Sequence, residues 1–428
     1  MPGARSYKRD NLSEELRTRH SPLGNADRHA LAALREHSRF VIDGIRSTIG
    51  SQLHLSREEP LQRVLAGLES NQVVLISGVA GSGKSGIAKD VIAILEHDHF
   101  AFCFRAEEFA HPHLDAMLQS SQIPVSATRL GAILSGQGRK VLLVESVERL
   151  LEKSNRDAFT DLLSLVTNDA TWRLILTCRD YSADLVRSSF LEFARIDHTV
   201  VNVPALSDAD LEQVVITYPS MVRPLADVAL RRLLRIPYVL DKALQINWAE
   251  DRPLPQGERE FRSLFWKQIV RVEHHPKLGW PSRRGQAFVQ IALRRAQALS
   301  PFANCSDVAS DVIDDLRRDS LVVCSNQNTV LAAPAHDALE DWAILQWLDE
   351  QHALHNGSIA ELIAAIGTFP AVRRSYRKWV GELVEWDLPS ADSLFHSVMS
   401  RDDIPAHFRD DTLVSMLRSS ERLSEKST

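Results

Sequence analysis

Residues 78–85 read GVAGSGKS, and they lie between an apolar run and a segment with helical spacing. The run before them, QVVLIS at 72–77, is rich in β-branched side chains and predicts a buried parallel strand. The segment after them, 86–95, places apolar residues at helical intervals. Gly78, four further residues and then Gly83-Lys84-Ser85 have the spacing of a phosphate-binding loop. A plain Gly/Ser connector would explain neither the lysine nor this spacing.

The residue types in this loop suit a chain of phosphates. Glycines let the backbone curl until successive N–H groups point inward, and the following helix adds the positive end of its dipole. Lys84 is expected to reach the β- and γ-phosphates, and Ser85 to ligate Mg²⁺. We therefore predict that ATP or ADP binds here with Mg²⁺, in contact with Gly78, Gly81, Gly83, Lys84, Ser85 and Gly86.

A second strand supplies candidate acids. Residues 140–148 read KVLLVESVE, so an apolar run leads directly into Glu145, and Glu148 follows soon after. Nucleotide hydrolysis needs an acid on the metal side and a carboxylate that orients the attacking water. We assign Glu145, together with Ser85, to the metal and Glu148 to the base. Both acids also fit a simpler interpretation, in which they are solvent-facing residues after a buried strand.

A third apolar strand, LILT at 174–177, ends in Cys178-Arg179-Asp180. The tip of such a strand lies at the carboxyl edge of a parallel sheet, where ligands bind. Thr177 or Arg179 is therefore placed to sense the γ-phosphate, and Arg179 is a candidate catalytic residue. The alternative is a surface arginine that pairs with Asp180.

Strands and helices alternate along the chain up to about residue 204. An alternation of this kind gives a parallel sheet with helices on both faces. The predicted fold is therefore an α/β P-loop NTPase domain, with strands at 73–77, 100–104, 141–144, 174–177 and 199–203.

Helical patterns flank this domain on both sides. An apolar stripe from Asp27 to Gly50 predicts one helix, and Ser56–Glu59 reads as a capping box that opens another. A β-hairpin at 321–324 and 329–331, followed by a helix from His336, is typical of a winged helix. We expect an N-terminal helical segment (1–52), the P-loop ATPase domain (53–204), a helical lid (205–252), a winged-helix-like domain (253–350) and an α-helical segment (351–428). The last segment has helical stretches at 359–369, 372–386 and 391–401, which would begin a set of helical repeats.

The composition is that of an ordinary soluble protein. Of 428 residues, 44% are hydrophobic and 25% charged, and the net charge of −6 gives no global attraction to nucleic acid. No apolar stretch approaches the roughly 18 residues that cross a membrane, and the N-terminus lacks the apolar core of a secretory signal. The cysteines are too scattered to form a metal-binding pair. We expect a cytoplasmic protein with no membrane partner.

Taken together, GVAGSGKS, VLLVESVE and LILTCR resemble the STAND class of signalling ATPases, the relatives of NACHT and NB-ARC proteins. VESVE stands where that class commonly has Asp-Gly-x-Asp, so Glu145 replaces an aspartate. The longer side chain would alter the geometry at Mg²⁺ or slow hydrolysis. The resemblance extends over about residues 53–350.

Two further segments carry the same resemblance. Residues 234–240, LRIPYVL, look like the Gly-x-Pro segment of the class, whose proline lies against adenine. This implies a nucleotide contact for Pro237, although Arg235 replaces the glycine. Ala335-His336-Asp337 is similar to the Met-His-Asp motif and implies that His336 touches the β-phosphate of ADP. From the residues alone, Pro237 is equally a helix terminus, and His336 a locally satisfied helix start.

The resemblance implies an ATP-binding switch that ADP closes and ATP opens, with homo-oligomerisation on activation. In bacteria such proteins often serve antiviral defence. The trigger, protein or nucleic acid, is not encoded in a readable motif. Two alternatives remain open: a DNA-handling AAA+-type ATPase that uses its winged helix on DNA, and a scaffold that binds nucleotide without turning it over. The acidic residues that follow His336 would repel a phosphate backbone.

Overall fold

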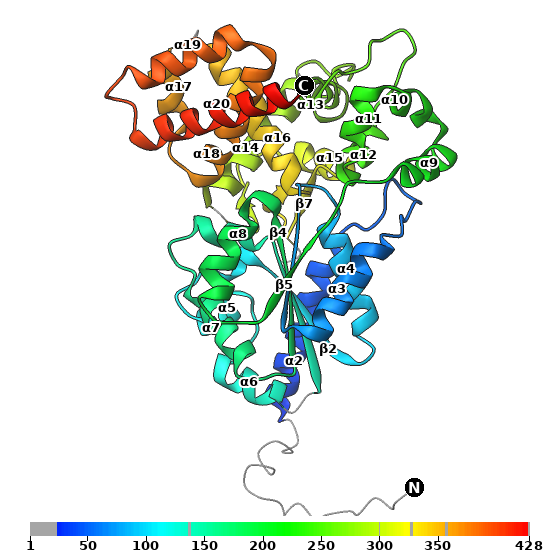
Figure 1. Ribbon diagram of the computed structural model, residues 1–428, viewed down its shortest axis with the longest axis vertical. Coiled ribbons are helices and arrows are strands. Elements are labelled where there is room, and N and C mark those ends of the chain that lie inside the picture. The colour runs from blue at the N-terminus through cyan, green and yellow to red at the C-terminus, as the bar shows by residue number, and fades with distance from the viewer. Residues whose placement is uncertain (1–23, 136–137, 299, 326–327, 356–357, 427–428) are drawn as a thin grey trace, which may run out of the picture. The chain divides into compact units, whose positions relative to one another are not determined.

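The computed structural model describes residues 24–135, 138–298, 300–325, 328–355 and 358–426. The chain divides into two compact units, Met1–Leu206 and Ser207–Thr428. Figure 1 labels the helices and strands of both units.

The first unit is built on a five-stranded parallel sheet with the order β2-β3-β4-β1-β5. Its strands are β1 (Val73–Gly78), β2 (His99–Arg105), β3 (Arg139–Glu145), β4 (Trp172–Arg179) and β5 (His198–Asn202). The predicted strands and the α/β P-loop fold are therefore confirmed.

The core of this unit is split by the sheet into two layers. Alternate residues of each strand point to opposite faces: Val73 and Leu75 belong to one apolar cluster, whereas Val74 and Ile76 belong to the other. Both faces are apolar because helices cover both. In Figure 1, α5 (Leu114–Ser120), α6 (Ala127–Ser135), α7 (Asp157–Thr167) and α8 (Ala183–Val186) lie on one side of the sheet, and α3 (Glu58–Ser70) and α4 (Lys84–Leu95) on the other.

Helix α2 (Asn25–Asp43) packs along the edge strand β2. The predicted helix was too long, because α2 stops at Gly44, and Ile49 instead forms an isolated β-bridge with Leu53. The predicted capping box at Ser56 is also wrong. The N-cap of α3 is Arg57, whose side chain makes no capping bond.

Short helical turns connect the strands of the first unit. They are η2 (Ala106–Phe109), η3 (Val147–Glu152), η4 (Asp180–Ser182) and η5 (Arg187–Glu192). Three of them follow the carboxyl ends of β2, β3 and β4, so they form the edge at which a ligand would bind.

The second unit is mainly helical. Its helices are α9 (Asp208–Thr217), η6 (Pro219–Met221), α10 (Val222–Ala226), α11 (Val228–Leu234), α12 (Pro237–Ala243), α13 (Glu258–Phe265), η7 (Trp266–Val270), α14 (Trp280–Ala298), α15 (Ser310–Arg318), α16 (Asp337–Leu354), α17 (Ile359–Ile366), α18 (Pro370–Trp386), α19 (Leu388–Met399) and α20 (Ala406–Lys426). A small antiparallel sheet has the order β6-β8-β7, with β6 (Ala303–Asn304), β7 (Val322–Cys324) and β8 (Leu331–Pro334). The first strand of the predicted hairpin is confirmed as β7, whereas the second lies later than predicted, because residues 329 and 330 form a turn and β8 begins only at Leu331.

The basic residues of α18 belong to ion pairs inside this unit. Arg373 donates to Asp411 at 2.8 Å, Arg374 lies 3.3 Å from Asp341, and Lys378 donates to Glu258 at 2.5 Å. Arg374 is nearly inaccessible. These pairs join α18 to α13, α16 and α20, with Arg374 buried and Lys378 still 41% exposed.

Candidate nucleotide-binding site

Strand order brings the predicted site residues to one edge of the sheet. In the ladder between β1 and β4, Gly78 stands opposite Arg179. Strand β3 lies on the other side of β4, and its last residue is Glu145. The phosphate-binding loop, the tip of β4 and the acids after β3 are therefore neighbours in space, although the chain separates them by about a hundred residues.

The loop has the backbone that its glycines predict. Gly81 and Gly83 have φ angles of 77° and 93°, which side chains other than hydrogen rarely tolerate. A Cβ atom on Gly78 would lie 2.8 Å from Ser82 Oγ and 3.2 Å from the carbonyl oxygen of Val203. Position 78 therefore requires glycine because neighbouring atoms approach its Cα closely. Positions 81 and 83 require glycine because of their backbone conformation.

Lys84 turns back into the loop. Its Nζ donates to the carbonyl oxygens of Gly78 and Val79 at 2.9 and 2.8 Å. Burial is the main reason why the pKa of Lys84 lies below its usual value, and the carboxylate of Glu148 partly opposes this shift. The positive charge of Arg179 adds to the lowering. The structure therefore brings Lys84, Glu148 and Arg179 into one electrostatic cluster.

Glu148 and Arg179 form a buried ion pair. The Arg179 Nε atom lies 3.5 Å from Glu148 Oε1, and both side chains are less than 10% exposed. Arg179 is therefore not the surface arginine of the simpler interpretation, and the neighbouring Asp180 carboxylate accepts the amide of Tyr181. Burial raises the pKa of the neighbouring Cys178 thiol to about 12, so this thiol is a neutral packing group.

Glu145 ends β3 and is half-buried. The next residue, Ser146, has a φ of 57°, and its amide donates to the Thr177 hydroxyl at 2.9 Å. Thr177, which we predicted as a possible phosphate sensor, thus also fixes the turn after Glu145. This turn separates Glu145 from Glu148 and gives the two acids different surroundings.

The donor set at this edge suits Mg²⁺. Ser85 offers a hydroxyl in the first turn of α4, and Glu145 a carboxylate. No group of three His, Cys, Asp or Glu side chains among the described residues could hold a metal ion alone. Mg²⁺ commonly keeps several waters and binds nucleotide phosphates together with one or two protein oxygens.

The sequence of residues 48–227 matches the family model described as Novel STAND NTPase 1. This segment is a STAND-class P-loop NTPase domain. A domain of this class binds nucleotide through its phosphate-binding loop. No curated protein shows a significant sequence match to the chain.

Solved structures similar to the chain include a Walker-type ATPase of Pyrococcus abyssi, with 13% identity, a TM-score of 0.37 and coverage of 70% of this chain and 98% of that one. The ORC1 protein of Aeropyrum pernix in complex with DNA has 16% identity, a TM-score of 0.39 and coverage of 72% and 96%. A STAND protein with a tetratricopeptide repeat sensor from Pyrococcus horikoshii has 11% identity, a TM-score of 0.38 and coverage of 89% and 59%. Likenesses at these scores carry no argument about function.

The two motif-like segments outside the core of the STAND-class domain meet within the second unit. Pro237 is the first residue of α12, and His336 is the N-cap of α16. The ring of Tyr238 stacks on the His336 imidazole with the centroids 3.9 Å apart. His336 Nδ1 accepts the amide of Ala338 at 3.0 Å, so this nitrogen serves the helix cap and a phosphate contact would fall to Nε2.

Sequence reasoning missed an ion pair next to Glu148 in the STAND-class domain. Arg149 Nε lies 3.2 Å from Glu107 Oε1, and both side chains are almost completely buried. The signal that could have revealed Glu107 is its place shortly after a strand, at the same edge as the other site residues.

Within the described residues, no helix is long and apolar enough to span a membrane.

Proposed function

We propose that the protein binds ATP and ADP at Gly78–Gly86 and hydrolyses ATP slowly. The observation that carries this proposal is the convergence of Lys84, Glu148 and Arg179 at the carboxyl edge of the sheet. Lys84 would bind the β- and γ-phosphates, Glu148 would orient and deprotonate the attacking water, and Arg179 would sense the γ-phosphate.

Ser85 would ligate Mg²⁺ from the phosphate-binding loop, and Glu145 would hold the ion from the opposite side. The ion would neutralise charge on the β- and γ-phosphates. Glu148 is buried beside Arg179, and its carboxylate interacts electrostatically with Lys84, so it is placed to orient the attacking water near the phosphates.

The STAND-class domain supports a role as a signalling switch in which ADP stabilises the closed state and ATP the open state. Such a switch requires a nucleotide that binds the two states with different affinity. The proposal also includes oligomerisation on activation and contacts of Pro237 and His336 with the nucleotide. It further includes a cytoplasmic location and a part in bacterial antiviral defence. Its trigger is an unidentified protein or nucleic acid.

The test is the nucleotide content of the purified full chain, together with its hydrodynamic size in the presence of ADP or ATP and Mg²⁺. The proposal expects tightly held ADP and assembly that depends on ATP. Protein that retains no nucleotide and keeps the same size under both conditions would contradict the switch. A shift in size caused by DNA alone would favour the DNA-handling alternative.

A further inference from the structure

The buried ion pair of Glu107 and Arg149 occupies a position beside the proposed base. Glu107 belongs to η2, which follows β2, and Arg149 belongs to η3, which follows β3. Removing both charges from water is costly, and similar apolar residues often stabilise a protein as well as such a pair does. Stability alone therefore gives a weak reason for the pair at this place.

Consecutive residues of η3 are held from opposite sides. Glu148 faces Arg179 at the tip of β4, at 3.5 Å, whereas Arg149 faces Glu107 after β2, at 3.2 Å. The turn begins at Ser146, whose amide is held by Thr177. Beyond the turn, burial lowers the pKa of Lys153, and the nearby Glu107 carboxylate partly opposes this shift.

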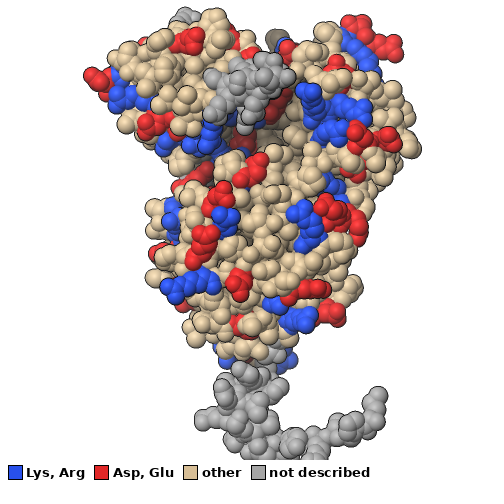
Figure 2. Space-filling model, in the orientation of Figure 1, with Lys and Arg blue, Asp and Glu red and all other residues tan. Residues whose placement is uncertain are grey.

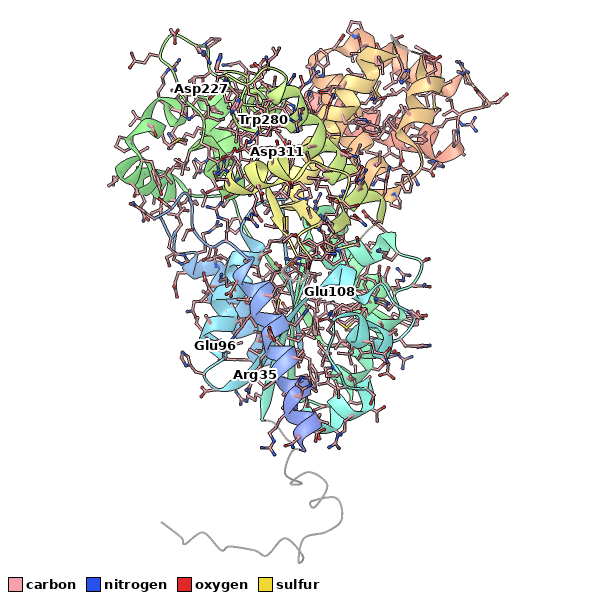
Figure 3. The ribbon with its side chains drawn as sticks, turned by 180° about the vertical axis from the view of Figure 1, so that it is seen from behind. Arg35, Glu96, Glu108, Asp227, Trp280 and Asp311 are labelled. Atoms are coloured by element: carbon pink, nitrogen blue, oxygen red, sulfur yellow. The ribbon has the colours of Figure 1, made fainter. Side chains whose placement is uncertain are left out.

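The partner turn η2 is itself fixed. Glu108 accepts the amide of Arg105 at 2.8 Å, and its other oxygen lies 3.1 Å from His37 Nε2 on α2. Figure 3 shows Glu108 beside helix α2. Glu107 is therefore presented by an anchored turn, and it is suited to fix the position of a neighbouring side chain.

We infer that Glu107 and Arg149 form a positioning pair for Glu148, an inference that rests on the proposed function. The ion pair holds η3 against η2. The backbone of Glu148 therefore keeps one position relative to Lys84 and the phosphate-binding loop. A base displaced by about 1 Å loses roughly a hundredfold in rate. Nucleotide affinity depends on the loop itself and is expected to change little.

An ion pair at the far end of β3 provides the matched control. Lys140, at the opposite end of β3, is completely buried and lies 2.8 Å from Asp169. Its loss should lower stability without displacing η3. The experiment compares Arg149→Met, Glu107→Gln, Arg149→Lys and Lys140→Met in the full chain.

The measurements are kcat, KM for ATP with Mg²⁺, the affinity for a fluorescent ADP analogue and the melting temperature. For Arg149→Met and Glu107→Gln we expect kcat to fall by roughly tenfold to a hundredfold, with KM and ADP affinity within about twofold of wild type. Arg149→Lys keeps the charge and should recover most of the lost kcat. Lys140→Met should lower the melting temperature and leave kcat unchanged.

Two results would overturn the inference. One is that Arg149→Met and Lys140→Met show the same small change in kcat. The other is that kcat and ADP affinity fall together, which would mean general collapse of the site. If Arg149→Met does not fold, Glu107→Gln, which preserves volume, is judged by the same criteria. Glu148→Gln serves as a separate reference: turnover that survives it refutes the proposed base, and the positioning role with it, whatever the pair mutants show.

Discussion

At the scale of single residues, Lys84 and Glu148 share an edge of the sheet but have different roles. The ammonium of Lys84 donates to two carbonyls of the loop, whereas the carboxylate of Glu148 is anchored on Arg179. Binding and hydrolysis should therefore respond separately to mutation of these two residues.

Replacement of Lys84 by alanine is expected to abolish ATP binding, because the lysine supplies the main side-chain charge at the phosphates. A titration with a fluorescent nucleotide measures this. Lys89→Ala is the matched control, since Lys89 lies on the same helix and donates to the carbonyl of Ile45. Full-strength binding by Lys84→Ala would refute the loop assignment.

Glu148→Gln should leave nucleotide binding intact and stop hydrolysis, because the change removes a base and keeps its shape. Loss of base catalysis alone costs about 10²–10⁴-fold in rate. Phosphate release under single-turnover conditions measures the effect. The division of roles is wrong if Glu145→Gln stops turnover and Glu148→Gln does not.

His336 combines a structural role that is seen with a ligand role that is proposed. His336→Ala removes the cap and should lower stability by about 1 kcal/mol, whereas His336→Asn keeps a capping oxygen. A hydrogen bond to a phosphate is worth roughly 1.5–3 kcal/mol, so both variants should release ADP roughly tenfold to a hundredfold faster. Stopped-flow release of labelled ADP and melting curves separate the two roles. An unchanged release rate for His336→Asn would leave only the cap.

At the scale of elements, helix α2 protects the edge of the sheet. An edge strand exposes backbone groups that would otherwise pair with another chain. Ser38 Oγ accepts the amide of Cys103 on β2 at 3.1 Å and donates to the carbonyl of Leu34 at 2.7 Å. A side chain of α2 therefore takes the place of a neighbouring strand at this position.

Ser38→Ala should destabilise the first unit by about 1–3 kcal/mol, because it leaves a buried amide without its partner. Urea unfolding and hydrogen exchange at the Cys103 amide measure the effect. Ser70→Ala is the control, since the exposed Ser70 hydroxyl donates to Ala66 within its own helix. Equal effects of the two mutations would show that the bond to β2 contributes nothing.

At the scale of the whole molecule, charge is distributed without a large basic surface on the face seen in Figure 2, where Lys and Arg alternate with Asp and Glu. The net charge is −6. Helix α16, the candidate recognition helix, contains no lysine or arginine, and its Asp337 and Glu340 contact Arg295 at 3.0 and 2.6 Å.

We therefore expect no specific DNA binding. A gel-shift assay at physiological salt should show no complex below about 1 µM protein, since non-specific binding lies at roughly 10⁻⁴–10⁻⁶ M. Nanomolar binding with a steep dependence on salt would contradict this expectation and revive the DNA-handling alternative.

The sequence by itself determined the phosphate-binding loop and the five strands, because these features depend on local spacing and composition. It also placed Glu145 and Arg179 at strand ends and Glu148 shortly after one. Local signals failed where packing competes with them, as at Gly44, where α2 ends early, and at Arg57, which replaces the predicted cap.

Only the tertiary structure decided which of these residues meet. The order of the strands inserts β4 between β1 and β3, and this order set Arg179 against Glu148. The pairing of Glu107 with Arg149 joins turns 42 positions apart, as the residue numbers show. Such pairs depend on long-range topology, in which strand order and burial select partners, and no periodicity along the chain encodes that choice.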